Sequence, residues 1–143
     1  MNNLNLILLI DDSDADNFFH RFVIEQTRIN CGIMNLEGSI QGLAYLKESL
    51  SREDNSEFPT PQVIFLDINM PAMNGFELLN KVRGIADPYD RKKDIKIFML
   101  TGSLNPDDRT LAAERYADLI TGFCIKPLTE SVVLDIVKEY FSD

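Results

Sequence analysis

The stretch Val63-Ile-Phe-Leu-Asp-Ile-Asn-Met-Pro-Ala-Met-Asn-Gly75 decides the fold of this chain. Four consecutive apolar residues lead directly into the carboxylate of Asp67, and a turn marked by Pro71 and Gly75 follows. Short apolar runs bounded by turn residues are typical of strands that are buried on both faces of a parallel sheet. The stretch therefore predicts a central strand with an acidic residue at its carboxyl end.

Other apolar runs also end on polar side chains. They are Leu6–Ile10 before Asp11 and Asp12, Ile97–Leu100 before Thr101, and Gly122–Ile125 before Lys126, with a weaker strand at Ile33–Leu36. An open parallel sheet binds its ligand outside the carboxyl ends of its strands. We therefore expect one crevice to be lined by Asp11, Asp12, Asp67, Thr101 and Lys126.

Helical patterns alternate with these strands. The predicted helices begin near Ser13 or Asp14, at Ser39, after the cap Asn74, after the cap Asn105 with Pro106 in the first turn, and after the cap Thr129. Crossovers between parallel strands are right-handed, so the pattern predicts a three-layer, doubly wound α/β sandwich.

The first helix carries several aromatic residues at helical spacing. Phe18, Phe19 and Phe22 are predicted to lie in the core rather than on a surface that stacks a ligand. His20 is the single histidine of the chain, and no second histidine or cysteine lies near it. We therefore expect His20 to lie at the surface or at the edge of the helix.

The chemistry of the predicted crevice indicates phosphoryl transfer. Three carboxylates repel one another unless a cation lies among them, and oxygen ligands favour a hard cation such as Mg²⁺. An ammonium at Lys126 and a hydroxyl at Thr101 are suited to hold the oxygens of a phosphoryl group. No Ser, Cys or His with a plausible base shares the crevice, so a carboxylate is the expected acceptor.

These residues, in this order, resemble the receiver (CheY-like) domain of two-component response regulators. The resemblance rests on the pair Asp11-Asp12, the stretch 63–75, Thr101 and Lys126-Pro127, and it extends over residues 4–142 as a single receiver domain. It implies a flavodoxin-like (βα)5 fold whose five parallel strands have the order 2-1-3-4-5. It also implies a cis peptide bond between Lys126 and Pro127.

The resemblance further implies a role for each site residue. Asp67 would accept a phosphoryl group from the phosphohistidine of a sensor histidine kinase or a histidine phosphotransfer protein. Asp12 would bind Mg²⁺ directly, Asp11 would act mostly through water, and the backbone carbonyl of Asn69 would complete the protein's share of the metal ligands. Lys126 would hold a phosphoryl oxygen.

Two residues correspond to the switch of the family. Thr101 would move toward the phosphoryl group, and Phe123 falls where the family places an aromatic switch residue, commonly Tyr. Ser103 and Asn69 fall at positions that tune dephosphorylation. The expected output is a changed surface on the fourth helix, fifth strand and fifth helix, recognised by a protein target that the sequence does not identify.

Composition agrees with a small signalling protein. The 143 residues fit one domain, so we expect no separate output domain, and a net charge of −9 would repel nucleic-acid backbones. The longest apolar run, Leu6–Ile10, is far shorter than the roughly 20 residues of a membrane-spanning helix. The amino terminus lacks the features of a signal peptide. We expect a cytoplasmic protein, a monomer or a weak dimer, with no membrane partner.

The remaining features have ordinary interpretations. Cys31 and Cys124 are expected to be buried free thiols, as is usual in a reducing cytosol. The long connections 51–62 and 84–94 are expected to be solvated loops.

Two other functions use similar residues. A phosphatase or phosphotransferase of the haloacid dehalogenase type also uses an aspartate nucleophile, but places it before the acidic pair and usually has a second aspartate where this chain has Asn69. A receiver-like interaction module that works without phosphorylation would usually have lost one of the site residues. We therefore expect a receiver that assists its own phosphorylation and dephosphorylation and is not a metabolic enzyme.

Overall fold

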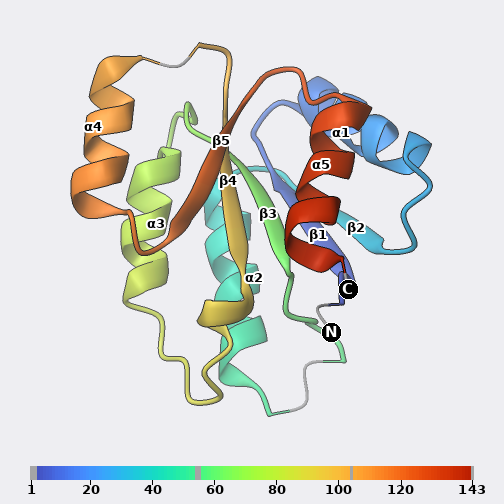
Figure 1. The fold of residues 1–143 in the computed structure, drawn as a ribbon. Coiled ribbons are helices and arrows are strands. Elements are labelled where there is room, and N and C mark those ends of the chain that lie inside the picture. The colour runs from blue at the N-terminus through green and yellow to red at the C-terminus, as the bar shows by residue number, and fades with distance from the viewer. Residues whose placement is uncertain (1–2, 54–55, 104, 143) are drawn as a thin grey trace.

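A five-stranded parallel sheet, in the order β2-β1-β3-β4-β5, forms the centre of the protein in a computed structural model (Figure 1). The structure describes residues 3–53, 56–103 and 105–142. The strands are β1 (Leu6–Ile10), β2 (Gly32–Leu36), β3 (Val63–Asp67), β4 (Lys96–Thr101) and β5 (Ile120–Ile125). The expected fold and strand order are both confirmed.

Helices cover both faces of the sheet. They are α1 (Asp14–Gln26), α2 (Ser39–Ser51), α3 (Gly75–Arg83), α4 (Pro106–Arg115) and α5 (Glu130–Phe141), with a short 3-10 helix at Lys92–Asp94. Figure 1 shows α1 and α5 on one side of the sheet and α2, α3 and α4 on the other. Two apolar clusters correspond to these two sides, so the predicted three-layer sandwich is confirmed.

The register of the strands brings the predicted site residues to one edge. Strands β1 and β3 are buried along their whole lengths, and Ile10 pairs with Leu66. Asp67 pairs with Leu100 on β4, and the backbone N–H of Lys126 donates to the carbonyl of Thr101. The carboxyl ends of β1, β3, β4 and β5 therefore lie next to one another.

Gly75 allows α3 to start directly beside the end of β3. A Cβ atom at this position would lie 2.6 Å from the carbonyl oxygen of Asp67, closer than real Cβ atoms approach backbone oxygen. Asn74 and Glu77 form a capping box that fixes the first turn of α3. This turn holds the loop after Asp67 against the strand.

The buried face of α1 differs from the expected one. Phe18, Phe19 and Phe22 are 74%, 44% and 49% exposed, whereas His20 is buried, so both expectations for this helix are wrong. The buried stripe instead contains Asn17, whose side-chain amide donates to the carbonyls of Asp11 and Leu36. Polar contacts to the strand ends set the rotation of the helix, and this rotation leaves the three phenylalanines outside.

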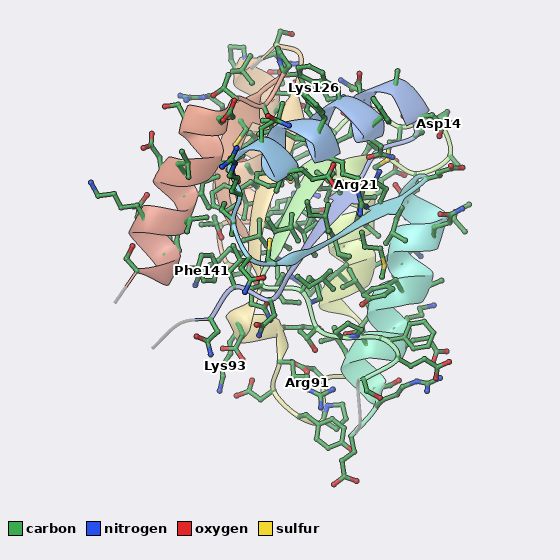
Figure 2. The ribbon with its side chains drawn as sticks, turned by 90° about the vertical axis from the view of Figure 1, so that its right-hand side faces the viewer. Asp14, Arg21, Arg91, Lys93, Lys126 and Phe141 are labelled. Atoms are coloured by element: carbon green, nitrogen blue, oxygen red, sulfur yellow. The ribbon has the colours of Figure 1, made fainter. Side chains whose placement is uncertain are left out.

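The connection 84–94 contacts the ends of two helices. Arg91, labelled in Figure 2, donates to the carbonyls of Ser49, Arg52 and Glu53 at the carboxyl end of α2. Lys92 donates to the carbonyl of Ile85 just after α3. Most residues of the connection are exposed, as expected of a solvated loop, and these two cations additionally bind backbone carbonyls near the ends of the helices.

The expected cis peptide bond is confirmed, and the expectation for the cysteines is confirmed in part. The peptide bond between Lys126 and Pro127 is cis. Cys31 and Cys124 are free thiols, and Cys124 is buried, but Cys31 is only half-buried. In the part of the chain that the structure describes, no helix has both the length and the apolar character to cross a membrane.

Candidate functional site

Three carboxylates meet at the carboxyl edge of the sheet. Asp11 and Asp12 follow β1, Asp67 ends β3, and one carboxylate oxygen of each lies within 4.8 Å of the others. Asp11 and Asp67 are buried, whereas Asp12 is exposed. The structure thus brings together the acidic residues that the sequence placed in one crevice.

Lys126 lies among these carboxylates. Its Nζ atom is 2.8 Å from Oδ2 of Asp11 and 3.2 Å from Oδ1 of Asp67. Burial by itself lowers the pKa of Lys126, but hydrogen bonds to Asp11 and Asp16 and the charges of Asp11 and Asp67 outweigh burial and raise it. The lysine is therefore a fixed cation beside the expected acceptor.

The surroundings of Asp67 disfavour the ionised form of its carboxyl group. Burial, together with the nearby charge of Asp11, raises the pKa of Asp67 from 3.8 to about 6. The charge and hydrogen bond of Lys126, and a backbone hydrogen bond from Asn69, act in the opposite direction without cancelling the rise. A cation that joined the cluster would favour the ionised, nucleophilic form of Asp67.

Thr101 is buried at the end of β4 with its hydroxyl bonded away from the carboxylates. The hydroxyl donates to the carbonyl of Ser103 over 2.7 Å, within the same loop. A single hydroxyl proton cannot be donated to two acceptors at full strength. Binding of an anion at Asp67 would therefore compete with the Ser103 carbonyl for this donor.

Sequence reasoning missed Asp16. Its Oδ2 atom accepts a hydrogen bond of 2.8 Å from Nζ of Lys126, which makes it a fourth carboxylate at the site. The signal in the sequence was the position of Asp16 in the first turn of a helix that begins three residues after Asp11. Side chains in that turn lie close to the same edge of the sheet.

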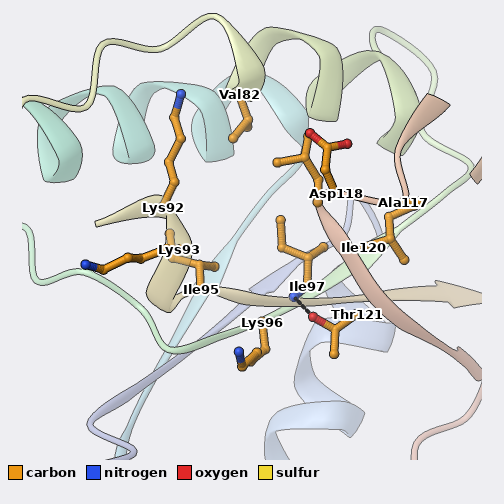
Figure 3. Close-up of a pocket in the computed structure, with 11 residues that line it drawn as sticks. Val82, Lys92, Lys93, Ile95, Lys96, Ile97, Ala117, Asp118, Ile120 and Thr121 are labelled. Carbon is orange, nitrogen blue, oxygen red and sulfur yellow. Dashed lines mark hydrogen bonds between the residues drawn. The ribbon is translucent and has the colours of Figure 1, made fainter. Parts of the chain in front are cut away.

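Among the hollows that the described residues form away from the carboxylates are a groove and a pocket. Phe123, which is half-buried, lines a groove of about 440 Å³ between α4 and β5, together with Arg109, Gly122 and several alanines. A pocket of about 250 Å³ lies at the other end of β4 (Figure 3). The second pocket is lined by Lys92, Lys93 and Lys96, but these ammonium groups already contact Ile85, Asp90 and the ring of Tyr140 respectively.

The donor set at the carboxylates fits Mg²⁺. Asp11, Asp12 and Asp67 offer hard oxygen ligands, and the cluster contains no histidine or cysteine. Mg²⁺ usually binds one or two carboxylates, retains several waters and takes further oxygens from a phosphate. The exposed Asp12 leaves one side of the cluster open to such ligands.

Comparisons with known proteins agree with this geometry. The family model described as the response regulator receiver domain matches residues 7–138. Response regulator Rcp1 of Synechocystis is 31% identical over 103 residues, which are 72% of this chain and 65% of that protein. The sensor histidine kinase CheAY of Helicobacter pylori is 27% identical over 93% of this chain, which spans only 14% of the kinase.

A solved structure gives the same result for the fold. A two-component response regulator from Cytophaga hutchinsonii is 26% identical and superposes with a TM-score of 0.81, covering 99% of each chain. The chain spans slightly less than two thirds of Rcp1 and a small part of CheAY, so similarity to these relatives concerns the matched region.

Neutralising the acceptor should stabilise the metal-free protein at neutral pH. The raised pKa of Asp67 means that the folded state binds its proton more tightly than the unfolded state. The free energy of unfolding therefore falls as the pH rises from about 4 to above 6. Above this range Asp67 is ionised in both the folded and the unfolded state. Asp67→Asn should raise the free energy of unfolding at pH 8 by roughly 1–3 kcal/mol, and by little at pH 4.

Urea unfolding in EDTA, followed by circular dichroism at several pH values, measures this difference. Asp14→Asn, at an exposed position in the first turn of α1, is the control for a general change of charge. Adding Mg²⁺ should reduce the difference in the free energy of unfolding between Asp67→Asn and the parent. A variant that is less stable than the parent at pH 8 in EDTA would contradict the raised pKa of Asp67.

Proposed function

The chain belongs to the response regulator receiver domain family, and from this premise we propose that it is a signalling protein switched by phosphorylation of Asp67. The observation that carries the proposal is the position of Lys126, whose ammonium lies 3.2 Å from an Asp67 oxygen inside a cluster of three carboxylates. A buried carboxylate, a fixed cation and a set of hard oxygen ligands together supply what phosphoryl transfer needs.

The donor would be a phosphohistidine of a sensor kinase or a phosphotransfer protein. One oxygen of Asp67 forms a bond to phosphorus while the bond from phosphorus to the imidazole nitrogen breaks. The imidazole leaves with the electron pair of that bond and takes up a proton. Lys126 binds a phosphoryl oxygen and offsets its charge, and Thr101 supplies a second donor after releasing the carbonyl of Ser103.

Mg²⁺ would be held by Asp12, Asp67 and the backbone carbonyl of Asn69, with Asp11 acting through water. When bound, the ion shields the charge of the incoming phosphoryl group from the carboxylates. The buried position of Asp67 excludes bulk water from the acceptor oxygen.

We propose a signalling role rather than catalytic turnover of a substrate. The order of the motifs argues against the dehalogenase type of phosphatase, since Asp11 and Asp12 precede the nucleophile in the chain. A module that works without phosphorylation is disfavoured because Asp67, Thr101 and Lys126 are all present and adjacent. Residues 4–142 would act as one receiver unit in the cytoplasm, as a monomer or weak dimer, with a protein rather than a nucleic acid as target.

Labelling with acetyl phosphate tests the acceptor. In the presence of Mg²⁺ the parent should gain one phosphoryl group, seen as a mass increase in intact-protein mass spectrometry. Asp67→Asn should remove the label, because an amide oxygen is a far weaker nucleophile than a carboxylate, and EDTA should suppress it. Equal labelling of Asp67→Asn and the parent would show that the acceptor is another residue.

The exposed face of α1 is a candidate surface for the phosphodonor. Phe18, Phe19 and Phe22 lie outside the core, on the helix that begins three residues after Asp11. A cluster of exposed aromatic residues is unusual for the free surface of a monomer. A donor that places its histidine at Asp67 must also cover the start of α1, so we include this face in the proposed function.

Phe18→Ser should therefore slow phosphoryl transfer from a protein donor but not from a small-molecule donor. Transfer from a histidine kinase or phosphotransfer protein that labels the parent should slow by at least about tenfold, because aromatic contacts dominate protein interfaces. Labelling by acetyl phosphate should stay unchanged. Leu134→Ser, which removes an exposed apolar side chain from α5, is the matched control. Equal transfer to Phe18→Ser and the parent would exclude this surface.

The proposed output runs through Thr101 and Phe123 to α4, β5 and α5. Movement of the Thr101 hydroxyl toward the phosphoryl group vacates space beside β5, and Phe123 lines the groove between β5 and α4. Without the hydroxyl of a tyrosine, the position of this ring depends on packing alone. We expect Phe123 to be mixed or outward in the resting protein and inward in the activated one.

NMR spectra recorded with and without beryllofluoride and Mg²⁺ test this route. Beryllofluoride should shift resonances from about Asp107 to Ile125 as well as those of the loops around Asp12 and Asp67. Thr101→Ala should weaken the distant shifts and leave Mg²⁺ binding largely intact, because a ligand shifts an equilibrium only through differential affinity. Shifts confined to the loops around the site in the parent would exclude the route.

A further inference from the structure

The ammonium of Lys126 is shared with a carboxylate outside the expected set of site residues. Asp16 accepts a hydrogen bond of 2.8 Å from Nζ, which equals the bond to Asp11 and is shorter than the 3.2 Å separation from Asp67. An ammonium has three N–H donors. Two of these donors bond to Asp11 and Asp16, and Asp67, the proposed phosphoryl acceptor, is the most distant of the three carboxylates.

A ring of hydrogen bonds fixes this arrangement. The backbone N–H of Ser13 donates to Oδ1 of Asp11, and the backbone N–H of Asp16 donates to the Ser13 hydroxyl. Lys126 then closes the ring by donating to Oδ2 of both aspartates. One contact of this ring, from the backbone N–H of Asp16 to the Ser13 hydroxyl, is the amino-terminal cap of α1, so the position of the lysine is tied to the start of that helix.

The two aspartates differ in how readily they can release the lysine. The side chain of Asp11 is 2% exposed and also accepts from Ser13, whereas the side chain of Asp16 is 43% exposed. A carboxylate that reaches water can replace a lost hydrogen bond with bonds to water. Asp16 is therefore the partner that Lys126 can leave when a phosphoryl oxygen needs its donors.

We propose that Asp16 is a positioning residue that competes with the phosphoryl group for Lys126 and so weakens the phosphorylated state. The inference rests on the proposed function. The charge of Asp16 weakens phosphoryl binding in two ways. The carboxylate retains an N–H donor of Lys126 that the phosphoryl oxygens would use, and it repels the phosphoryl anion directly. Removing this charge should strengthen the binding of a phosphoryl mimic.

Asp16→Asn tests the proposal with little change to the fold. The cap of α1 uses the backbone N–H of residue 16, which the variant keeps. At saturating Mg²⁺, the apparent dissociation constant for beryllofluoride should fall by about two- to fivefold, the range expected for a partly exposed ion pair. Amide NMR shifts measure the constant, and thermal unfolding confirms that each variant is folded.

Two matched variants isolate the contact. Asp14→Asn makes the same change of charge in the same first turn, at an exposed position outside the ion pairs of Lys126 (Figure 2). Asp16→Glu keeps the charge. Both should bind beryllofluoride as the parent does, whereas a purely structural role for Asp16 would lower thermal stability without strengthening the binding of the mimic.

The outcomes distinguish failure of the inference about Asp16 from failure of the proposed function. Tighter binding by Asp16→Asn alone supports the competition. Equal tightening by Asp14→Asn, or unchanged or weaker binding by Asp16→Asn, overturns it, and the proposed function stands if acetyl phosphate still labels Asp67 in the parent. A parent that neither binds beryllofluoride nor accepts phosphate refutes the proposed function, and the inference with it.

Discussion

Repulsion among the carboxylates at the end of the sheet is the constraint on which the rest of the structure depends. Asp11 and Asp67 are buried within reach of each other. Burial, and after it the charge of Asp11, raises the pKa of Asp67 to about 6. One ammonium, that of Lys126, offsets part of this repulsion. The arrangement favours whatever adds positive charge, so in the proposed function a cation would bind before the phosphoryl group.

The rigid sheet holds these charges in place. The carboxyl ends of β1, β3 and β4 are fixed by strand pairing, and Gly75 lets α3 begin against the carbonyl of Asp67. Side chains on such elements cannot move apart to relieve repulsion, because the apolar strands beneath them are fully packed. Relief must therefore come from a bound cation and from hydrogen bonds.

The strands and the meeting of Asp11, Asp12, Asp67 and Lys126 were predictable because short apolar runs end on these polar residues, whereas the strand order followed only from the resemblance to receiver domains. The rotation of α1 was not predictable, because its apolar stripe is wide and the choice of buried face depends on Asn17, which donates to carbonyls of two strands. Asp16 was missed for the same reason, since its contact with Lys126 joins residues 110 positions apart. Periodicity identifies a helix, but tertiary hydrogen bonds decide which side faces inward.

Helix α4, part of the proposed output surface, is attached more lightly than the site. Among the described residues of α4, only Ala112 is buried, and the end of the helix is held by Arg83, which donates to the carbonyl of Arg115 and pairs with Asp118. In the proposed function, a packed cluster of charges is coupled to a lightly packed helix beside the groove at Phe123. A helix with little buried surface is the kind of element that a small change in hydrogen bonding at Thr101 would be able to shift.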